Sequence, residues 1–134
     1  MKHIVKRFYS EIWNQYDKSL IPELLHADFT FHGSLGVEKR GHSGFVEYVD
    51  FIHNALGEYH CDIQEIIHED NKVFARLLFT GIHKTRFSNF EPTGKTLSWQ
   101  GAALFTIEND KIINAWILGD KYSLLEILKR NANN

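Results

Sequence analysis

The sequence has little of several features that mark specialised classes of protein. Cys61 is its only cysteine, so no disulfide can form within the chain, which fits a reducing compartment. No apolar run approaches the roughly 20 residues that a membrane-spanning helix needs. Residues 1–7 are too polar for a secretory signal. We therefore expect a cytoplasmic protein.

The chain also lacks a basic stripe, and its net charge is −2. Nucleic acid is not an expected partner, because phosphate binding needs a positive surface. There are only two prolines, and no repeat or low-complexity segment divides the 134 residues. We expect a single domain over residues 1–134, long enough to bury a core.

Aromatic residues are abundant, at 13% of the chain, which suits a bulky core or an apolar cavity. The first part of the chain has helical spacing of its apolar residues. That spacing predicts helices over residues 3–16, about 19–25 and 45–56, with a short strand at 28–32 between the second and third.

After Gly57 the apolar period changes to two, which indicates strands. We expect strands at 61–68, 72–87, 97–108 and 111–120, with a terminal helix after them. Helices first and long strands afterwards are typical of the α+β class. The predicted architecture is a curved antiparallel sheet wrapped around N-terminal helices, forming a cone-shaped barrel with an internal pocket.

Asp120 is the charged residue at the end of the mostly apolar strand 111–120. Alternate residues of a strand share a face, so Trp116, Leu118 and Asp120 point the same way. If that face is interior, the pKa of the carboxyl group rises and Asp120 can act as a general acid/base. Alternatively, Asp120 caps the terminal helix, with Ser123 three residues further on. The two roles are compatible, because an aspartate that caps the helix can also face a pocket.

Two histidines are candidate companions of Asp120. His83 shares the interior face of the 72–87 strand with Phe79, and His32 ends the first strand. Each is either a hydrogen-bonded wall residue or a group that orients a substrate. The expected walls are aromatic side chains that serve either as core or as ligand contacts: Trp13, Tyr48, Trp99 and Trp116.

This set of residues predicts proton abstraction next to a carbonyl group. A carboxylate in an apolar site would take the proton, and an imidazole or a phenol would hydrogen-bond the enolate. No cofactor is required for this chemistry. We expect no metal either, because none of the eight histidines has the i, i+4 helical spacing of a zinc site.

Several fragments, in order, resemble the SnoaL-like polyketide (ester) cyclases, within the nuclear transport factor 2-like group of cone-shaped folds. The resemblance spans about residues 5–128. The fragments are Glu11-Ile12-Trp13-Asn14, Leu24-Leu25-His26-Ala27-Asp28-Phe29, His32, Arg40-Gly41-His42-Ser43-Gly44-Phe45, Gly81-Ile82-His83, Pro92-Thr93-Gly94-Lys95, Lys111-Ile112, Trp116 and Asp120.

The resemblance implies ring closure by intramolecular aldol condensation without a cofactor, with an aspartate at the place of Asp120 as general acid/base. It also implies a homodimer or higher homo-oligomer built on the sheet face. The chain departs from the family at Thr85, where a second glycine is common, and at Tyr48, where one cyclase subgroup uses an amide. A tetracyclic substrate does not follow from the resemblance.

Two hypotheses follow for the function. In the first, the protein is a cofactor-independent lyase, isomerase or cyclase that acts on a small apolar carbonyl compound, with Asp120 and His83 as catalytic residues. In the second, it is a non-catalytic module for small-molecule binding or dimerisation on the same fold. A deep cavity with Asp120 at its floor favours the enzyme, whereas a filled cone with Asp120 exposed at a helix start favours the module.

Overall fold

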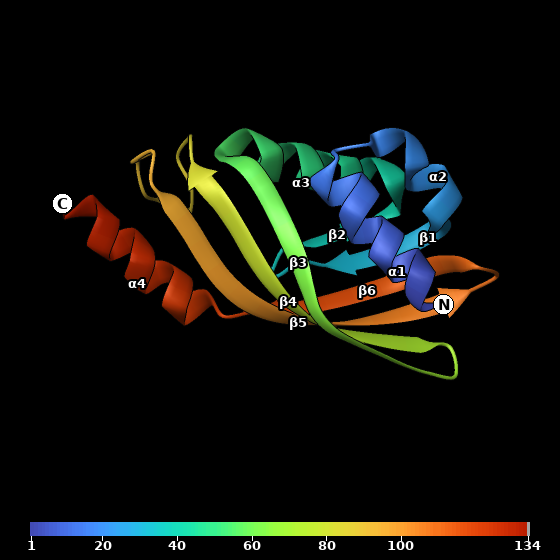
Figure 1. Cartoon of the computed structure of the whole chain (residues 1–134). Coiled ribbons are helices and arrows are strands. Elements are labelled where there is room, and N and C mark those ends of the chain that lie inside the picture. Colours follow the sequence, from blue (N-terminus) through green and yellow to red (C-terminus); the bar gives the residue numbers. More distant parts are fainter. Residues whose placement is uncertain (134) are drawn as a thin grey trace.

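The computed structural model describes residues 1–133, in which helices cover one face of a curved sheet and a last helix extends from its end (Figure 1). The elements in chain order are α1 (Lys2–Arg7), the π-helix η1 (Phe8–Asn14), the 3-10 helix η2 (Lys18–Leu20), α2 (Ile21–Leu24), β1 (Leu25–His32), β2 (Glu38–Arg40), α3 (Gly41–Ala55), β3 (Leu56–Glu69), β4 (Lys72–His83), β5 (Thr96–Glu108), β6 (Lys111–Gly119) and α4 (Lys121–Ala132). None of the helices within residues 1–133 is long and apolar enough to cross a bilayer.

The six strands form one open sheet in the order β2-β1-β6-β5-β4-β3. This confirms the α+β class and the curved sheet around N-terminal helices. The expected sheet was antiparallel, but β1 runs parallel to β6. The chain between these two strands holds most of the domain, so no hairpin forces them to be antiparallel. The sheet does not close into a barrel, since β2 and β3 remain its edges.

The strand boundaries differ from the predicted ones at the end of β4. The predicted strand ran to residue 87, but β4 ends at His83, and a tight turn at Ser88 and Asn89 brings Phe87 opposite Phe90. Both turn residues have positive φ, at 49° and 69°. Asparagine tolerates this left-handed conformation better than most residues do.

The concave face of the sheet is buried under α1, η1 and α3. The predicted interior faces of the two central strands are confirmed, because Phe79 and His83 of β4 and Trp99 and Phe105 of β5 are buried. The buried stripe of α3 is also as predicted, with apolar residues at Phe45, Tyr48, Val49, Ile52 and Ala55.

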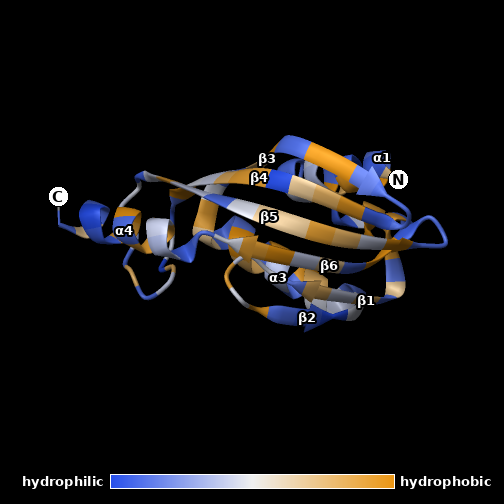
Figure 2. Cartoon of the chain, turned by 90° about the horizontal axis from the view of Figure 1, so that it is seen from below, coloured by the Kyte–Doolittle hydropathy of each residue, from blue (hydrophilic) through white to orange (hydrophobic). Residues whose placement is uncertain are grey.

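The interior face of β6 is the opposite of the one considered for Asp120. Ala115 and Ile117 are buried, whereas Trp116 is 45% exposed and Leu118 is 57% exposed on the outer face. Both faces of this strand are apolar, so alternation alone could not show which one the core covers. Figure 2 views the molecule from below and shows apolar residues along β5 and β6.

Asp120 is the N-cap of α4. Its carboxylate accepts hydrogen bonds from the Ser123 backbone N–H (3.0 Å) and from the Ser123 hydroxyl (2.7 Å). These bonds favour the ionised form, so the pKa of Asp120 is lowered rather than raised. The expectation of a carboxyl group with a raised pKa beside Trp116 and Leu118 is therefore corrected.

A close approach joins the end of β6 to the loop after β1. The Gly119 backbone N–H donates to the Ser34 carbonyl at 3.2 Å, and a Cβ atom on Gly119 would lie 2.6 Å from that same oxygen. We predict that Gly119→Ala lowers the free energy of unfolding by about 1–3 kcal/mol, because the loop must move away. Denaturant titration measures this.

Gly57→Ala is the matched control, since a Cβ atom there would have contacts of 3.5 Å and longer. It should be neutral or stabilising by up to about 1 kcal/mol. Equal effects of the two substitutions would show that the contact with Ser34 does not constrain the fold.

The capping role of Asp120 gives a pH-dependent prediction. Asp120→Ala lowers the melting temperature at neutral pH, whereas Asp120→Asn retains most of the stability, because asparagine is also a favoured N-cap. Because folding lowers the carboxyl pKa, ionised Asp120 stabilises the fold. This stabilisation is complete above the ordinary carboxyl pKa of about 3.9 and is lost as the pH falls through the pKa of the folded state. The gap between wild type and the alanine variant should therefore narrow in acid, and a constant gap would contradict the cap.

Candidate functional site

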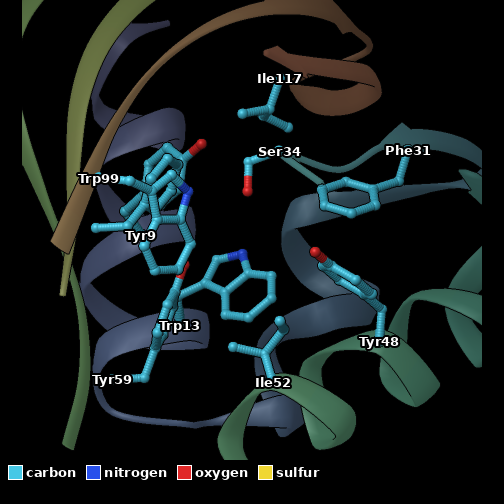
Figure 3. A pocket seen from close by; sticks show the side chains of 10 residues that line it. Tyr9, Trp13, Phe31, Ser34, Tyr48, Ile52, Tyr59, Trp99 and Ile117 are labelled. Carbon is cyan, nitrogen blue, oxygen red and sulfur yellow. The ribbon is translucent and has the colours of Figure 1, made fainter. Parts of the chain in front are cut away.

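An aromatic cavity lies between the N-terminal helices and the concave face of the sheet (Figure 3). Nearly every layer of the fold contributes a side chain to it, from η1 to β6. The lining residues are Tyr9, Trp13, Phe31, Ser34, Tyr48, Ile52, Tyr59, Phe79, Trp99 and Ile117. Concave, mostly apolar places with a few polar groups are where small ligands usually bind.

The cavity is narrow. The empty space at this site is about 320 Å³, some of it open to solvent, but the part open to the centre of a water molecule is only about 20 Å³. That part holds one or two water molecules. A compound with even one ring would enter only if the lining side chains moved. Hollows on the surface are larger, up to about 580 Å³, but they are more open to solvent, so we take the aromatic cavity as the candidate site.

The π-helix η1 brings two of the lining residues onto one wall. Tyr9 and Trp13 are four residues apart and are both buried. The end of η1 is held from two sides. The His53 ring hydrogen-bonds the Trp13 carbonyl at 2.8 Å, and the Asn14 amide pairs with the backbone of Cys61 at 2.8 and 3.0 Å. These contacts fix where the Trp13 ring stands in the cavity.

The other walls are joined by ring contacts. Trp99 of β5 stacks on Phe79 of β4 with ring centroids 5.3 Å apart. On the helix side, the Trp13 ring lies 6.0 Å from that of Tyr48 and 5.4 Å from that of Tyr59. Such pairs stabilise the packing beyond the area they bury. The walls of the cavity are therefore joined to one another by ring contacts.

The polar groups of the lining are uncharged. The hydroxyls of Tyr48 and Ser34 are both part of the lining. The Tyr9 hydroxyl and the Trp99 Nε1–H are buried and have no hydrogen-bond partner within residues 1–133. Burial raises the pKa of Tyr9, Tyr48 and Tyr59, because it disfavours the phenolate, so all three phenols keep their protons at neutral pH.

Of the predicted site residues, Trp13, Tyr48 and Trp99 line the cavity. Sequence reasoning missed Tyr9, Ser34 and Tyr59. Tyr9 carried a signal, since it lies one helical turn before Trp13 on the same apolar stripe. Ser34 stands in a loop and Tyr59 precedes the segment predicted as a strand, so neither had a pattern that pointed inward.

His32 and Trp116 lie on the outer face of the sheet. Their rings stack with centroids 5.8 Å apart, and His32 Nδ1 contacts the Ile117 carbonyl at 3.1 Å. They border a surface hollow with Arg40 and Asn114 rather than the cavity. The structure thus separates these two predicted residues from Trp13, Tyr48 and Trp99.

His83 is fully buried but does not line the cavity. Its Nε2 lies 3.2 Å from the Phe90 carbonyl, and the ring of Phe87 lies 6.4 Å away. Since a carbonyl only accepts, Nε2 carries the proton and donates it in this contact. This is the geometry of a wall residue that ties the 84–95 loop to the sheet.

Asp120 borders a shallow hollow on the outer face of the sheet with Arg76, Gln100 and Leu118. The predicted constellation of Asp120, His83 and His32 therefore does not converge on one point. No group of three or more metal-ligating side chains occurs in the described part of the chain.

Comparison with known proteins gives the family. The model of the SnoaL-like polyketide cyclase family matches residues 3–128 of this chain. No curated protein matches. Several solved structures share the fold at low sequence identity.

A protein from Acidithiobacillus ferrooxidans, described provisionally as a polyketide cyclase, has a TM-score of 0.86 at 21% identity, covering 98% of this chain and 95% of its own. TsrD from Streptomyces laurentii has a TM-score of 0.83 at 18% identity, covering 95% and 92%. A protein with a ketosteroid isomerase-like fold from Catenulispora acidiphila, in complex with trimethylamine, has a TM-score of 0.79 at 15% identity, covering 94% and 92%.

These structures establish the fold, and the family model covers nearly the whole chain. The resemblance that the sequence fragments indicated is thereby confirmed. The chain belongs to the SnoaL-like polyketide cyclase family.

Proposed function

We propose that this protein binds a small apolar molecule in the aromatic cavity between η1, α3 and the sheet. The observation that carries the proposal is the enclosure itself: seven of the ten lining residues are aromatic, and the polar tips that reach it are uncharged. Apolar walls with a few placed polar groups are the usual design of a ligand pocket. A ligand of one ring would have to displace some of the lining side chains, because the accessible space is about 20 Å³.

Acid/base catalysis is the second candidate, and membership of a cyclase family favours it. The ten lining residues include no carboxylate and no imidazole, so a base would have to come from elsewhere. Asp120 faces the outer surface, and its pKa is lowered by the bonds from Ser123. A cavity that binds without proton transfer fits this geometry better than a lyase with Asp120 as its base.

The exposed face of the sheet supports a second proposal, that two copies of the chain associate through it. Leu104, Trp116 and Leu118 are large apolar residues exposed on neighbouring positions of β5 and β6. Adjacent apolar side chains on a sheet face mark surfaces that another protein covers. A homodimer is the simplest occupant, since one patch then serves both partners.

Blocking the cavity tests the binding proposal. Ile52→Phe adds a ring beside Trp13 and should weaken binding of acetophenone at least tenfold, as measured by calorimetry. Because overpacking also costs stability, the variant must first be shown to fold by its melting curve. Leu118→Phe adds a ring on the outer face and should leave the affinity within about twofold. Unchanged affinity in Ile52→Phe would place the ligand elsewhere.

Asp120→Asn separates binding from catalysis. We expect the affinity for acetophenone to stay within about twofold, because the carboxylate does not line the cavity. A large loss of affinity, or loss of a turnover that the wild type shows, would instead support the general acid/base role.

The dimer is tested by placing charge on the exposed face. The double variant Leu104→Glu/Leu118→Glu should shift the mass measured by light scattering from dimer to monomer, because like charges would meet across the interface. Val37→Lys, an exposed apolar position in the loop after β1, is the control. A wild-type protein that is already monomeric would contradict the proposal.

A further inference from the structure

The aromatic cavity can admit a molecule larger than water only if one of its walls moves. The space open to the centre of a water molecule is about 20 Å³, and each of the aromatic side chains in the lining is at most 7% exposed. A ring compound that enters must therefore push one of these side chains aside. The side chain that moves must also border a space on the outside.

Tyr9, Phe31 and Tyr48 each line both the cavity and a larger hollow on the surface. Two of these rings are packed into the core. The Tyr9 ring lies edge-on against fully buried Phe105 with centroids 5.8 Å apart, and the Phe31 ring lies 5.0 Å from that of fully buried Phe45. Displacing either ring would leave a void in the core, which is costly. Tyr48 is therefore the candidate for the moving side chain.

Tyr48 stands between the cavity and the outside. It belongs to α3, and on its other side lies a hollow of about 350 Å³ that it shares with Val37, Lys39, Glu47 and Phe51. Val37 is 38% exposed and Phe51 is 49% exposed, so two large apolar side chains stand at the rim of this hollow. A small apolar molecule gains there by leaving water before it reaches the cavity.

The surroundings of the Tyr48 ring allow it to turn. In Figure 3 the ring lies beside Phe31 at the edge of the cavity. Towards the loop after β1 it faces Gly33, where a Cβ atom would lie 3.1 Å from the Tyr48 hydroxyl oxygen and 3.0 Å from the Phe31 ring. Towards the hollow it meets the Phe51 ring, with centroids 6.4 Å apart. A ring that turns outward keeps an aromatic contact, and its hydroxyl reaches water.

We propose that Tyr48 is the gate of the aromatic cavity: its ring turns into the hollow beside Val37 and Phe51, and small apolar molecules enter through the gap that it leaves. This inference rests on the proposed binding function and adds the route of entry and the side chain that moves. Because only this ring moves, the cluster around Phe45 stays packed while the cavity opens.

Quenching of tryptophan fluorescence by acrylamide tests the gate without a ligand. Trp13 and Trp99 line the cavity, whereas Trp116 is 45% exposed on the outer face, so Trp116→Phe is made first to remove its signal. In this background Tyr48→Ala should raise the quenching constant at least about threefold, because the space left by the ring joins the cavity to the hollow.

Tyr59→Ala in the same background is the matched control. Tyr59 also lines the cavity and is buried, but it does not border the hollow beside Phe51. Its removal enlarges the cavity by a similar volume without opening this route, so quenching should rise much less. Both variants are first shown to fold by their melting curves. Equal quenching in the two variants would show general loosening and would overturn the gate.

A surface variant keeps the test independent of changes in the lining. Phe51→Ser removes the ring against which the open gate rests, so it should slow both entry and release of acetophenone about three- to tenfold and leave the affinity within about twofold. Stopped-flow tryptophan fluorescence measures both rates. Tyr122→Ser, at a position on α4 that is 67% exposed, should change neither rate.

The outcomes separate the gate from the binding function. Rates in Phe51→Ser equal to those of wild type would overturn the route beside this residue. If acetophenone does not bind to wild type, the proposed binding function fails, and the quenching of Tyr48→Ala against Tyr59→Ala still decides whether Tyr48 controls access to the cavity.

Discussion

The packing of α3 against η1 and β1 through Phe45 is the contact on which the cavity depends. Phe45 is fully buried, and its ring meets those of Phe8, Trp13, Phe29 and Phe31 at centroid distances of 5.0–5.7 Å. This cluster sets the distance between the helices and the curved sheet. Phe31 and Trp13 continue from it into the cavity wall, so the space beside Phe45 is set by the core itself.

The aromatic lining explains the polarity of the site. Ring-on-ring packing leaves little empty space, and it surrounds the few polar groups with apolar surface, where an unmet hydrogen bond is costly. It also excludes charged side chains, which would lose their hydration there. Binding of an uncharged molecule therefore suits this cavity better than chemistry that needs an ionised base.

Family membership identifies the fold, whereas the local geometry of the site bears on the function. The fold is that of the SnoaL-like polyketide cyclases, but a fold hosts many functions and the site decides among them. In this chain the aspartate expected to do chemistry, Asp120, is held by Ser123 at the start of α4. Its carboxylate hydrogen-bonds the N-terminal turn of that helix instead of contacting a substrate.

The sequence allowed the order of helices and strands, the buried stripe of α3 and the interior faces of β4 and β5 to be predicted, because one face of each of these elements is clearly more apolar. The face of β6 could not be predicted in this way, since both Ile117 and Trp116 are apolar and tertiary packing decides between them. The loop position of Ser34 depends on contacts distant in sequence, so no local pattern revealed it. Tyr9 lies on the same apolar stripe as Trp13, but that stripe alone did not separate a cavity residue from a core residue.

The most direct test of this account is a crystal structure of the protein with acetophenone bound. Binding in the cavity predicts ligand density between the helices and the sheet, with the ring against Trp13. Density only on the outer face, beside Trp116 or Asp120, with the cavity unchanged, would contradict it.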